Sequence, residues 1–230
     1  MNSLRELLIE SPAAAEQPRI TSIREPIPRP TVSGAVMVRD EQIHALAQQL
    51  FFRGESKPVR HVAFAPIDAS IATAGLCLEV AQSVAEQGRY DVGLIDAHSE
   101  SVALQTELKI PSASRTESNW AITPRLWMVP RESWLPDASG GGISDQNLTR
   151  LRELTTEFDF CILWCAPVSW LTASISRTCD GVVLVLSANQ TRRQVAAQVK
   201  DRLSKARVPL LGTVLANRRF PVPQGLYRNL

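Results

Sequence analysis

From residue 60 onward, short runs of consecutive apolar residues alternate with segments of helical pattern. A strand that is apolar on both faces has to be covered on both faces, which is typical of a parallel sheet between two helical layers. The sequence therefore predicts an α/β fold with a doubly wound, mainly parallel sheet of about six or seven strands. The expected strands are 61–65, 91–96, 125–129, 158–164, 181–188 and 210–216. The expected helices are 71–88, 144–157 and 190–206, and residues 168–178 are expected to form a helix or a turn.

Ahead of this region the sequence predicts a tail and one further helix. Residues 1–36 hold four prolines between positions 18 and 30, which favour an extended, flexible chain. A helical pattern over 40–53 starts with Asp40 as the cap residue, and this helix is expected to pack on the core. Residues 37–230 are then one domain, long enough to bury a core without metal or disulfides.

Cysteine and histidine usage argues against a metal centre or a disulfide framework. The sequence has four cysteines without a CxxC pair and three histidines without ligand spacing. The expectation is reduced, buried thiols, no metal site and a cytoplasmic location. No apolar stretch is long enough for a membrane span, and the N-terminus lacks a secretory signal.

Charge is distributed unevenly along the chain. Residues 190–230 carry nine Lys or Arg and one acid, whereas the first 189 residues carry 16 basic and 22 acidic residues. Such a split indicates an anionic partner or self-association, while a merely solvated basic face is about equally compatible with it. The candidate partner-binding residues are Arg192, Arg193, Arg218 and Arg219. Nucleic-acid binding is not expected, because no recognition motif accompanies these charges.

The turn after the first strand is where a sheet of this kind usually binds phosphate. A phosphate loop needs glycines for backbone approach, a lysine for charge and a Ser or Thr for magnesium. Here the turn reads APIDASIATAG, with no glycine between Gly54 and Gly75 and no lysine between Lys57 and Lys109. Its own charge is Asp68, which would repel a triphosphate.

Four strings nevertheless resemble the cytoplasmic kinase domain of the bacterial tyrosine autokinases of capsular and exopolysaccharide synthesis, which are deviant-Walker P-loop ATPases. These strings are LIDAH (94–98), FDFCILWCAP (158–167), CDGVVLVLSANQTRR (179–193) and VPLLGTVLANRRFPVP (208–223), and the chain closes with LYRNL (226–230). The resemblance runs from about residue 40 to the end and implies a P-loop NTPase-like fold.

The resemblance also implies where the family's site residues fall in this chain. The phosphate-loop lysine falls at or near Thr73, its glycines fall near Ser70 and Ala72, and Ala74 follows. Asp96 corresponds to the acid of the family's second Walker motif. The adenine-reading asparagine falls on Ala216, beside Asn217. Trp164 stands where the family has its Walker B aspartate, and the C-terminal tyrosine cluster is reduced to Tyr227.

Because phosphoryl transfer depends on positioning and on stabilising phosphate charge, losing these groups together predicts no useful turnover. The leading hypothesis is a catalytically degenerate, pseudo-ATPase member that acts as a scaffold or regulator. In this hypothesis no cofactor is expected; ATP and magnesium bind only if the degenerate site still accepts them. The implied partner is a membrane-embedded co-polymerase or export component, or an active paralogue, with homo-oligomers and a peripheral place at the inner membrane also considered.

Two other functions stay open. One is a residually active ATP-dependent tyrosine kinase that works through Asp96 and Thr73, and the other is a partitioning-type positioning protein. Asp96 is interpreted mainly as a relic, with a cation site formed with His98 and Asp68 as the alternative.

The tryptophans also leave interpretations open. Trp164 is expected to fill the vacated metal and phosphate space and to donate its indole N–H to Asp96. The other tryptophans are expected either to be buried in the core or to form an exposed patch for a partner. They are Trp120, Trp127, Trp134 and Trp170.

Overall fold

The computed structural model describes residues 36–52, 58–98, 104–110, 119–136, 143–188 and 190–216. Seven strands form one sheet in the order β3-β4-β2-β5-β1-β6-β7. All neighbours are parallel except β3 and β4, so the predicted doubly wound, mainly parallel sheet is confirmed. The strands are β1 His61–Pro66, β2 Val92–Ala97, β3 Trp120–Thr123, β4 Leu126–Val129, β5 Phe160–Cys165, β6 Gly181–Ser187 and β7 Leu210–Ala216.

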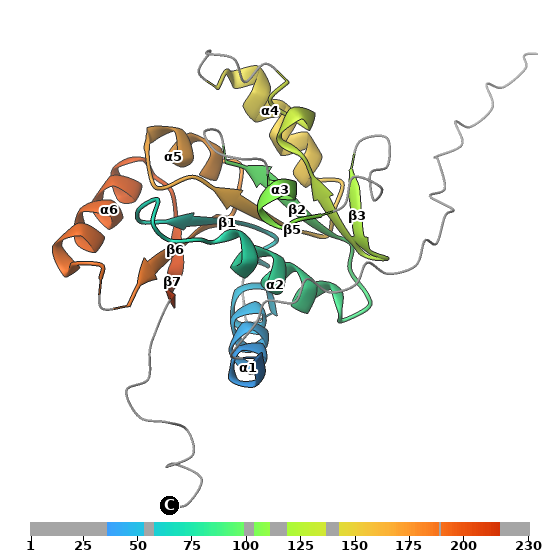
Figure 1. Cartoon of the computed structure of the whole chain (residues 1–230). Helices are drawn as coiled ribbons and strands as arrows, with labels where there is room; N and C mark the ends of the chain where they lie inside the picture. The colour runs from blue at the N-terminus through green and yellow to red at the C-terminus, as the bar shows by residue number, and fades with distance from the viewer. Residues whose placement is uncertain are drawn as a thin grey trace, which may run out of the picture.

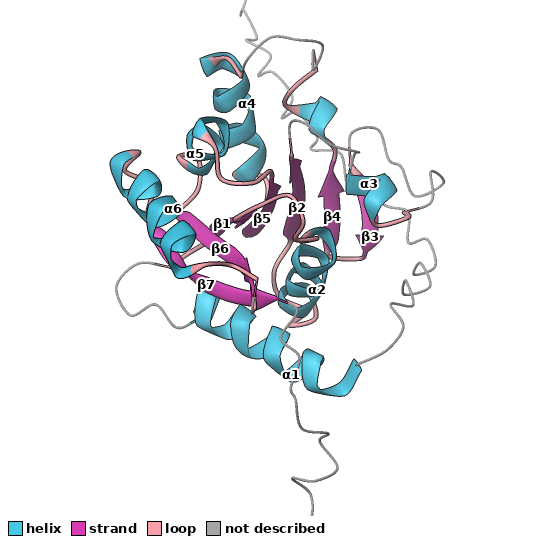
Figure 2. Ribbon diagram, turned by 60° about the vertical axis from the view of Figure 1, so that its left-hand side comes forward, coloured by secondary structure: helices cyan, strands magenta, loops and turns pink. Residues whose placement is uncertain are grey.

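Helices cover both faces of the sheet. Helices α4, α5 and α6 lie on one face, and α1 and α2 lie on the other (Figures 1 and 2). Among the described residues, no helix has the length and apolar character that a membrane crossing requires. The helices are α1 Val36–Ala47, α2 Ala74–Ala85, α3 Leu104–Glu107, α4 Asp145–Thr155, α5 Trp170–Ser176 and α6 Arg193–Lys205, with a π-helical turn η1 at Gln48–Phe52 and a 3-10 turn η3 at Arg131–Ser133.

The first helix packs on the core as predicted, although it starts earlier than Asp40. It begins at Val36 and continues through the π-helical turn to Phe52. Phe51 and Phe52 each contact the ring of Phe160 edge to face, with centroids 5.2 and 5.4 Å apart. This aromatic cluster attaches the helix to the start of β5. Residues 1–35 of the predicted tail and residues 217–230 lie outside the described part of the chain.

Strand β3 is the one strand that the sequence pattern did not predict. It has only four residues, and its burial alternates because it lies at the sheet edge. The prolines that border this region, Pro111 and Pro124, conceal the short run further. An edge strand needs no continuous apolar run, so the signal that located the other six strands is absent here.

The centre of the sheet is fully buried. Val62 to Ala65 of β1 have no exposed surface, and every residue of β5 is buried. All four cysteines are free; Cys77, Cys161 and Cys165 are buried, and Cys179 is half-buried. Burial raises the pKa of the Cys179 thiol to about 12 and raises the pKa values of the other three well above their usual range. These thiols are packing groups rather than nucleophiles.

The tryptophans divide between core and surface instead of forming one patch. Trp134 is fully buried and Trp120 is 4% exposed, so the core interpretation is confirmed for both. Trp127 is half-buried, and its ring lies 6.1 Å from that of Phe158. Trp170 alone is strongly exposed, at 71%.

The contact between β6 and β7 generates a stability prediction. A Cβ atom added at Gly181 would lie 2.7 Å from both the Pro209 carbonyl oxygen and Leu211 Cγ. Because a backbone oxygen has little freedom to move, we expect Gly181→Ala to lower the free energy of unfolding by about 1–3 kcal/mol in urea titrations. Gly212 is the matched control, since a Cβ atom there meets nothing within 4 Å. Equal losses in Gly181→Ala and Gly212→Ala would contradict this packing.

Candidate functional site

The candidate site lies where the carboxyl ends of β1, β5 and β2 meet. These three strands are neighbours in the sheet, and ligands of doubly wound sheets bind outside this edge. The loop 67–73 runs from β1 to α2, Asp96 lies near the end of β2, and Trp164 lies near the end of β5. Trp164 is in register with Phe64 on one side and Asp96 on the other. The fold therefore brings together Thr73, Asp96 and Trp164, as the sequence predicted.

The Trp164 side chain closes the space between the loop and the strands. Its indole Nε1 donates a hydrogen bond to Thr73 Oγ1 at 2.9 Å, and both residues are buried. The His98 ring lies against the indole, with centroids 4.6 Å apart and planes inclined by 34°. Thr73 is also the N-cap residue of α2, yet its side chain makes no capping bond. The Thr73 hydroxyl at the start of this helix thus accepts the hydrogen bond of the indole instead of capping the helix.

The prediction that Trp164 donates to Asp96 is wrong. The Asp96 carboxylate instead accepts backbone N–H groups from its own side of the sheet: from Leu104 at 2.8 Å and from His98 at 3.1 Å. Its backbone carbonyl accepts the indole N–H of Trp134 at 2.8 Å. Asp96 therefore fixes the chain that follows β2. Trp164 donates instead to Thr73, in the loop after the other neighbouring strand, β1.

Burial of Asp96 sets its protonation. The side chain is 1% exposed, and desolvation raises its pKa to about 6, although the two backbone N–H donors and the Arg131 charge oppose this rise. Arg131 also donates to the His98 carbonyl at 2.8 Å. The carboxyl at the end of β2 is therefore a structural acceptor that holds two segments together.

The loop after β1 is folded around its own carboxylate. Asp68 accepts the backbone N–H of Ser70 at 2.9 Å and also the Ser70 hydroxyl. Asp68 and Ser70 are both exposed. In a phosphate loop the backbone N–H groups face the ligand, whereas here an N–H of the loop is already paired with a negative group of the protein. A phosphate at this position would meet like charge.

The remaining predicted positions are placed as follows. Ala72 is exposed, and Ala74 is buried as the first residue of α2. Arg192 is the N-cap residue of α6, and both Arg192 and Arg193 are exposed. Asn217, Arg218 and Arg219 lie outside the described residues. The identification of these positions as remnants of a nucleotide site, or as partner contacts, stays a prediction.

The described residues form no cation cluster at this edge. Nowhere in the described ranges do three His, Cys, Asp or Glu side chains gather so that they could hold a metal ion. The alternative in which Asp96, His98 and Asp68 bind a cation is therefore not supported, because Asp96 and Asp68 are turned toward different backbone segments.

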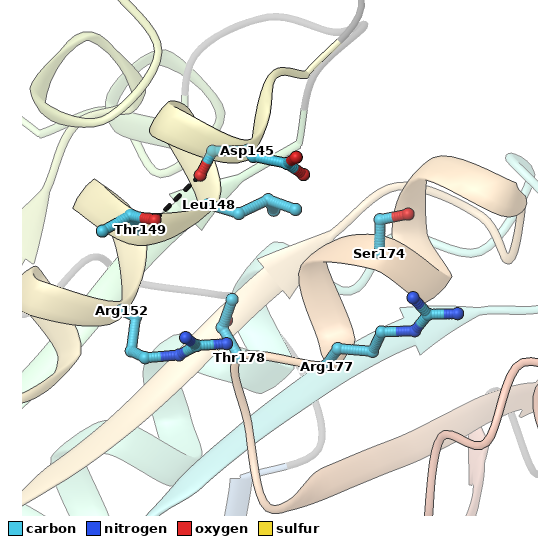
Figure 3. Close-up of a pocket in the computed structure, with 7 residues that line it drawn as sticks. All are labelled: Asp145, Leu148, Thr149, Arg152, Ser174, Arg177 and Thr178. Carbon is cyan, nitrogen blue, oxygen red and sulfur yellow. Dashed lines mark hydrogen bonds between the residues drawn. The ribbon is translucent and has the colours of Figure 1, made fainter.

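A surface groove of about 370 Å³ lies away from this edge, between α4 and α5 (Figure 3). None of the residues predicted from sequence lines it. The groove is lined by Asp145, Leu148, Thr149, Arg152, Ser174, Arg177 and Thr178. Its two arginines are both exposed, and Asp145 brings an opposite charge to the same groove. This mixed lining favours no single ligand class.

Comparison with known proteins identifies the fold. The kinase domain of Escherichia coli tyrosine kinase ETK is similar, with 18% identity over 89% of this chain and 88% of that chain, and a TM-score of 0.62. The BceF tyrosine kinase domain shows 22% identity over 76% of each chain with a TM-score of 0.59. A plasmid partition protein from Borrelia burgdorferi shows 13% identity over 76% of this chain and 86% of that chain, with a TM-score of 0.55.

These structural likenesses show that the chain has the P-loop NTPase-like fold of bacterial tyrosine kinase domains and of ParA-like ATPases. No family model matches the chain, and no curated protein matches its sequence. The predicted fold class is confirmed, and the resemblance to tyrosine autokinases agrees with the folds found.

The hydrogen bond between Trp164 and Thr73 generates a second prediction. Thr73→Val keeps the side-chain shape but leaves the buried indole N–H unpaired, so we expect the free energy of unfolding to fall by about 1–3 kcal/mol. Thr73→Ser keeps the hydroxyl and is expected to lose less, about 1 kcal/mol for the missing methyl group. Urea denaturation of both variants tests this; a smaller loss for Val than for Ser would refute the bond's contribution.

The raised pKa of Asp96 generates a third prediction. The folded pKa of about 6 lies above the usual value of 3.8, so the folded state holds the proton more tightly. This contribution to stability is full below pH 4 and is lost as the pH rises through 6, a loss of about 1–3 kcal/mol. Unfolding free energies measured between pH 4 and 7 should therefore fall more steeply in the wild type than in Asp96→Asn. Parallel pH profiles would show that Asp96 is not the titrating group.

Proposed function

We propose that this chain is a catalytically degenerate, tyrosine-autokinase-like pseudo-ATPase that acts as a scaffold or regulator in exopolysaccharide or capsule biosynthesis and export. The observation that carries the proposal is the Trp164 indole, hydrogen-bonded to Thr73 and stacked on His98 in the space where such a fold would seat phosphate and metal. Support comes also from the fold shared with tyrosine kinase domains and from the loop paired with Asp68.

The free-energy cost of moving the Trp164 indole aside supports loss of nucleotide binding. Turning an indole out of a buried site exposes about 150–250 Å² of mainly apolar surface, which costs about 4–6 kcal/mol. That cost alone weakens ligand binding by about a thousandfold or more. The like charge of Asp68 and the absence of a lysine in 67–73 add to it. A protein with this site keeps the surfaces of a kinase fold without its chemistry.

The proposed partners follow from the resemblance and from the charge. We propose a cytoplasmic protein, peripheral at the inner membrane, that binds a membrane-embedded co-polymerase or export component, or an active paralogue. The exposed Arg192 and Arg193 suit carboxylate or phosphate recognition by their planar guanidinium groups. Association with further copies of the chain is compatible with the same surface, and nucleic acid is not among the proposed partners.

One specific observation favours a second candidate function. Plasmid partition proteins share the fold at TM-scores of 0.52–0.55, so a partitioning-type positioning protein unrelated to polysaccharide fits the same architecture. The third possibility, a tyrosine kinase working through Asp96 and Thr73, is disfavoured because both side chains are already hydrogen-bonded within the protein.

Nucleotide binding gives the direct test. In isothermal titration calorimetry with ATP and magnesium up to about 1 mM, we expect no binding to the full chain, and we expect no ATP hydrolysis. An active tyrosine kinase domain serves as the positive control. Micromolar binding, or phosphorylation of Tyr227 that Asp96→Ala abolishes, would overturn the proposal in favour of an active kinase.

The scaffold role needs a separate measurement, because failure to bind ATP does not identify a partner. Affinity capture of the tagged full chain from its native cells, followed by mass spectrometry, should recover polysaccharide-export components or a paralogous kinase. Arg192→Glu/Arg193→Glu should reduce this recovery. Recovery of chromosome or plasmid segregation proteins instead would support the partitioning function.

A further inference from the structure

Three large hydrophobic side chains of the described chain are strongly exposed: Trp170 at 71%, Leu215 at 56% and Val195 at 42%. Each lies at or beyond the carboxyl end of a strand. Trp170 begins α5 just after β5, Val195 is in the first turn of α6 after β6, and Leu215 is the penultimate residue of β7. Because these strands are parallel, all three side chains lie at the same edge of the sheet.

The order of the strands sets the spacing of these positions along the edge. Strands β5, β1, β6 and β7 are consecutive in the sheet, and strands lie about 4.8 Å apart, so the ends of β5 and β7 are separated by about 15 Å. Helices α5 and α6 lie on the same face of the sheet (Figure 2). Scattered single apolar residues need no explanation, but we treat three at one edge of the sheet as a candidate patch.

Positive charge adjoins one part of this patch. Arg192 and Arg193 are exposed at the start of α6, next to Val195. The other basic residues of this region, from Lys200 to Arg207, lie in or after the second half of α6 and are therefore farther from this edge. In the described loops that follow β1, β5 and β6, the one acidic residue is Asp68. We call the set Trp170, Arg192, Arg193, Val195 and Leu215 the edge patch.

We infer that the edge patch binds directly to the surface of an anionic lipid bilayer. An indole and aliphatic side chains next to arginines match the interface of such a bilayer, where the rings sit at headgroup depth and the cations meet the lipid phosphates. The groove of Figure 3 is lined by other residues, so it is not part of the edge patch. A bilayer surface needs no cleft.

This inference rests on the proposed location at the inner membrane, and direct binding to lipid would explain how the protein is held there. It requires neither the loss of catalysis nor a protein partner, because lipid alone is the ligand. An acidic protein surface is the competing occupant, and the experiment below separates the two.

The experiment is cosedimentation of the purified full chain with vesicles of phosphatidylglycerol and phosphatidylcholine in equal amounts, with pure phosphatidylcholine vesicles as the comparison. At about 0.1 M salt we expect binding to the anionic vesicles only. Removing each arginine near the surface weakens binding about fivefold, so Arg192→Glu/Arg193→Glu should weaken it at least twentyfold. Arg150→Glu/Arg152→Glu, at exposed positions of α4, makes the same change in net charge and should leave most of the binding intact.

Tryptophan fluorescence reports whether the indole enters the lipid. Trp170 is the one strongly exposed tryptophan, since Trp120, Trp134 and Trp164 are buried and Trp127 is half-buried. Anionic vesicles that contain brominated acyl chains should quench the wild type and should quench Trp170→Phe much less. Trp170→Ala should weaken vesicle binding about tenfold, and circular dichroism checks that each variant is folded.

Three outcomes would overturn the inference. The first is no binding of the folded wild type to anionic vesicles. The second is binding that the edge-patch variants and the α4 control reduce equally, which would mean that only net charge acts. The third is binding only to membranes that contain an embedded protein partner, which would leave the proposed scaffold function standing while removing lipid as the ligand.

Discussion

The hydrogen bond from the Trp164 indole to Thr73 is the interaction on which the character of this carboxyl edge depends. It joins the end of β5 to the start of α2 across β1, and it places an apolar ring where a nucleotide fold keeps polar space. The bond is buried, so breaking it leaves an unpaired indole N–H in a dry interior. The protein therefore gains stability from the same contact on which we base the proposal that the site no longer admits a nucleotide.

The acidic side chains of this edge also make their hydrogen bonds to groups within the protein. Asp96 accepts two backbone N–H groups from the chain after β2, and Asp68 accepts the N–H of Ser70 within the loop after β1. At the opposite edge, Asp180 accepts the N–H groups of Arg60 and His61 and joins the starts of β1 and β6. Both edges of the sheet are thus held by carboxylates paired with backbone donors, whereas a nucleotide site would keep such donors directed at the ligand.

The sequence predicted most of the fold because buried parallel strands have a strong local signal. Six of the seven strands are continuous apolar runs, and each was located to within one or two residues. Strand β3 was missed because a four-residue edge strand carries no such run. Thr73, Asp96 and Trp164 lie at the expected edge of the sheet, but the sequence did not predict their hydrogen-bond partners. Whether Trp164 reaches Asp96 or Thr73 depends on strand register and on which backbone donors occupy Asp96 first, and neither is encoded within a few residues of Trp164.

Two tryptophans at the carboxyl edge have opposite surroundings, one buried and one exposed. Inside, Trp164 is 6% exposed and is fixed by a hydrogen bond and a stacked ring; outside, Trp170, six residues later in the chain, is 71% exposed. A large apolar group inside the edge is explained by packing, and Thr73 and His98 provide that packing for Trp164. Packing does not account for the exposed Trp170. The bilayer contact that we propose for Trp170 does not depend on whether the site behind it binds a nucleotide.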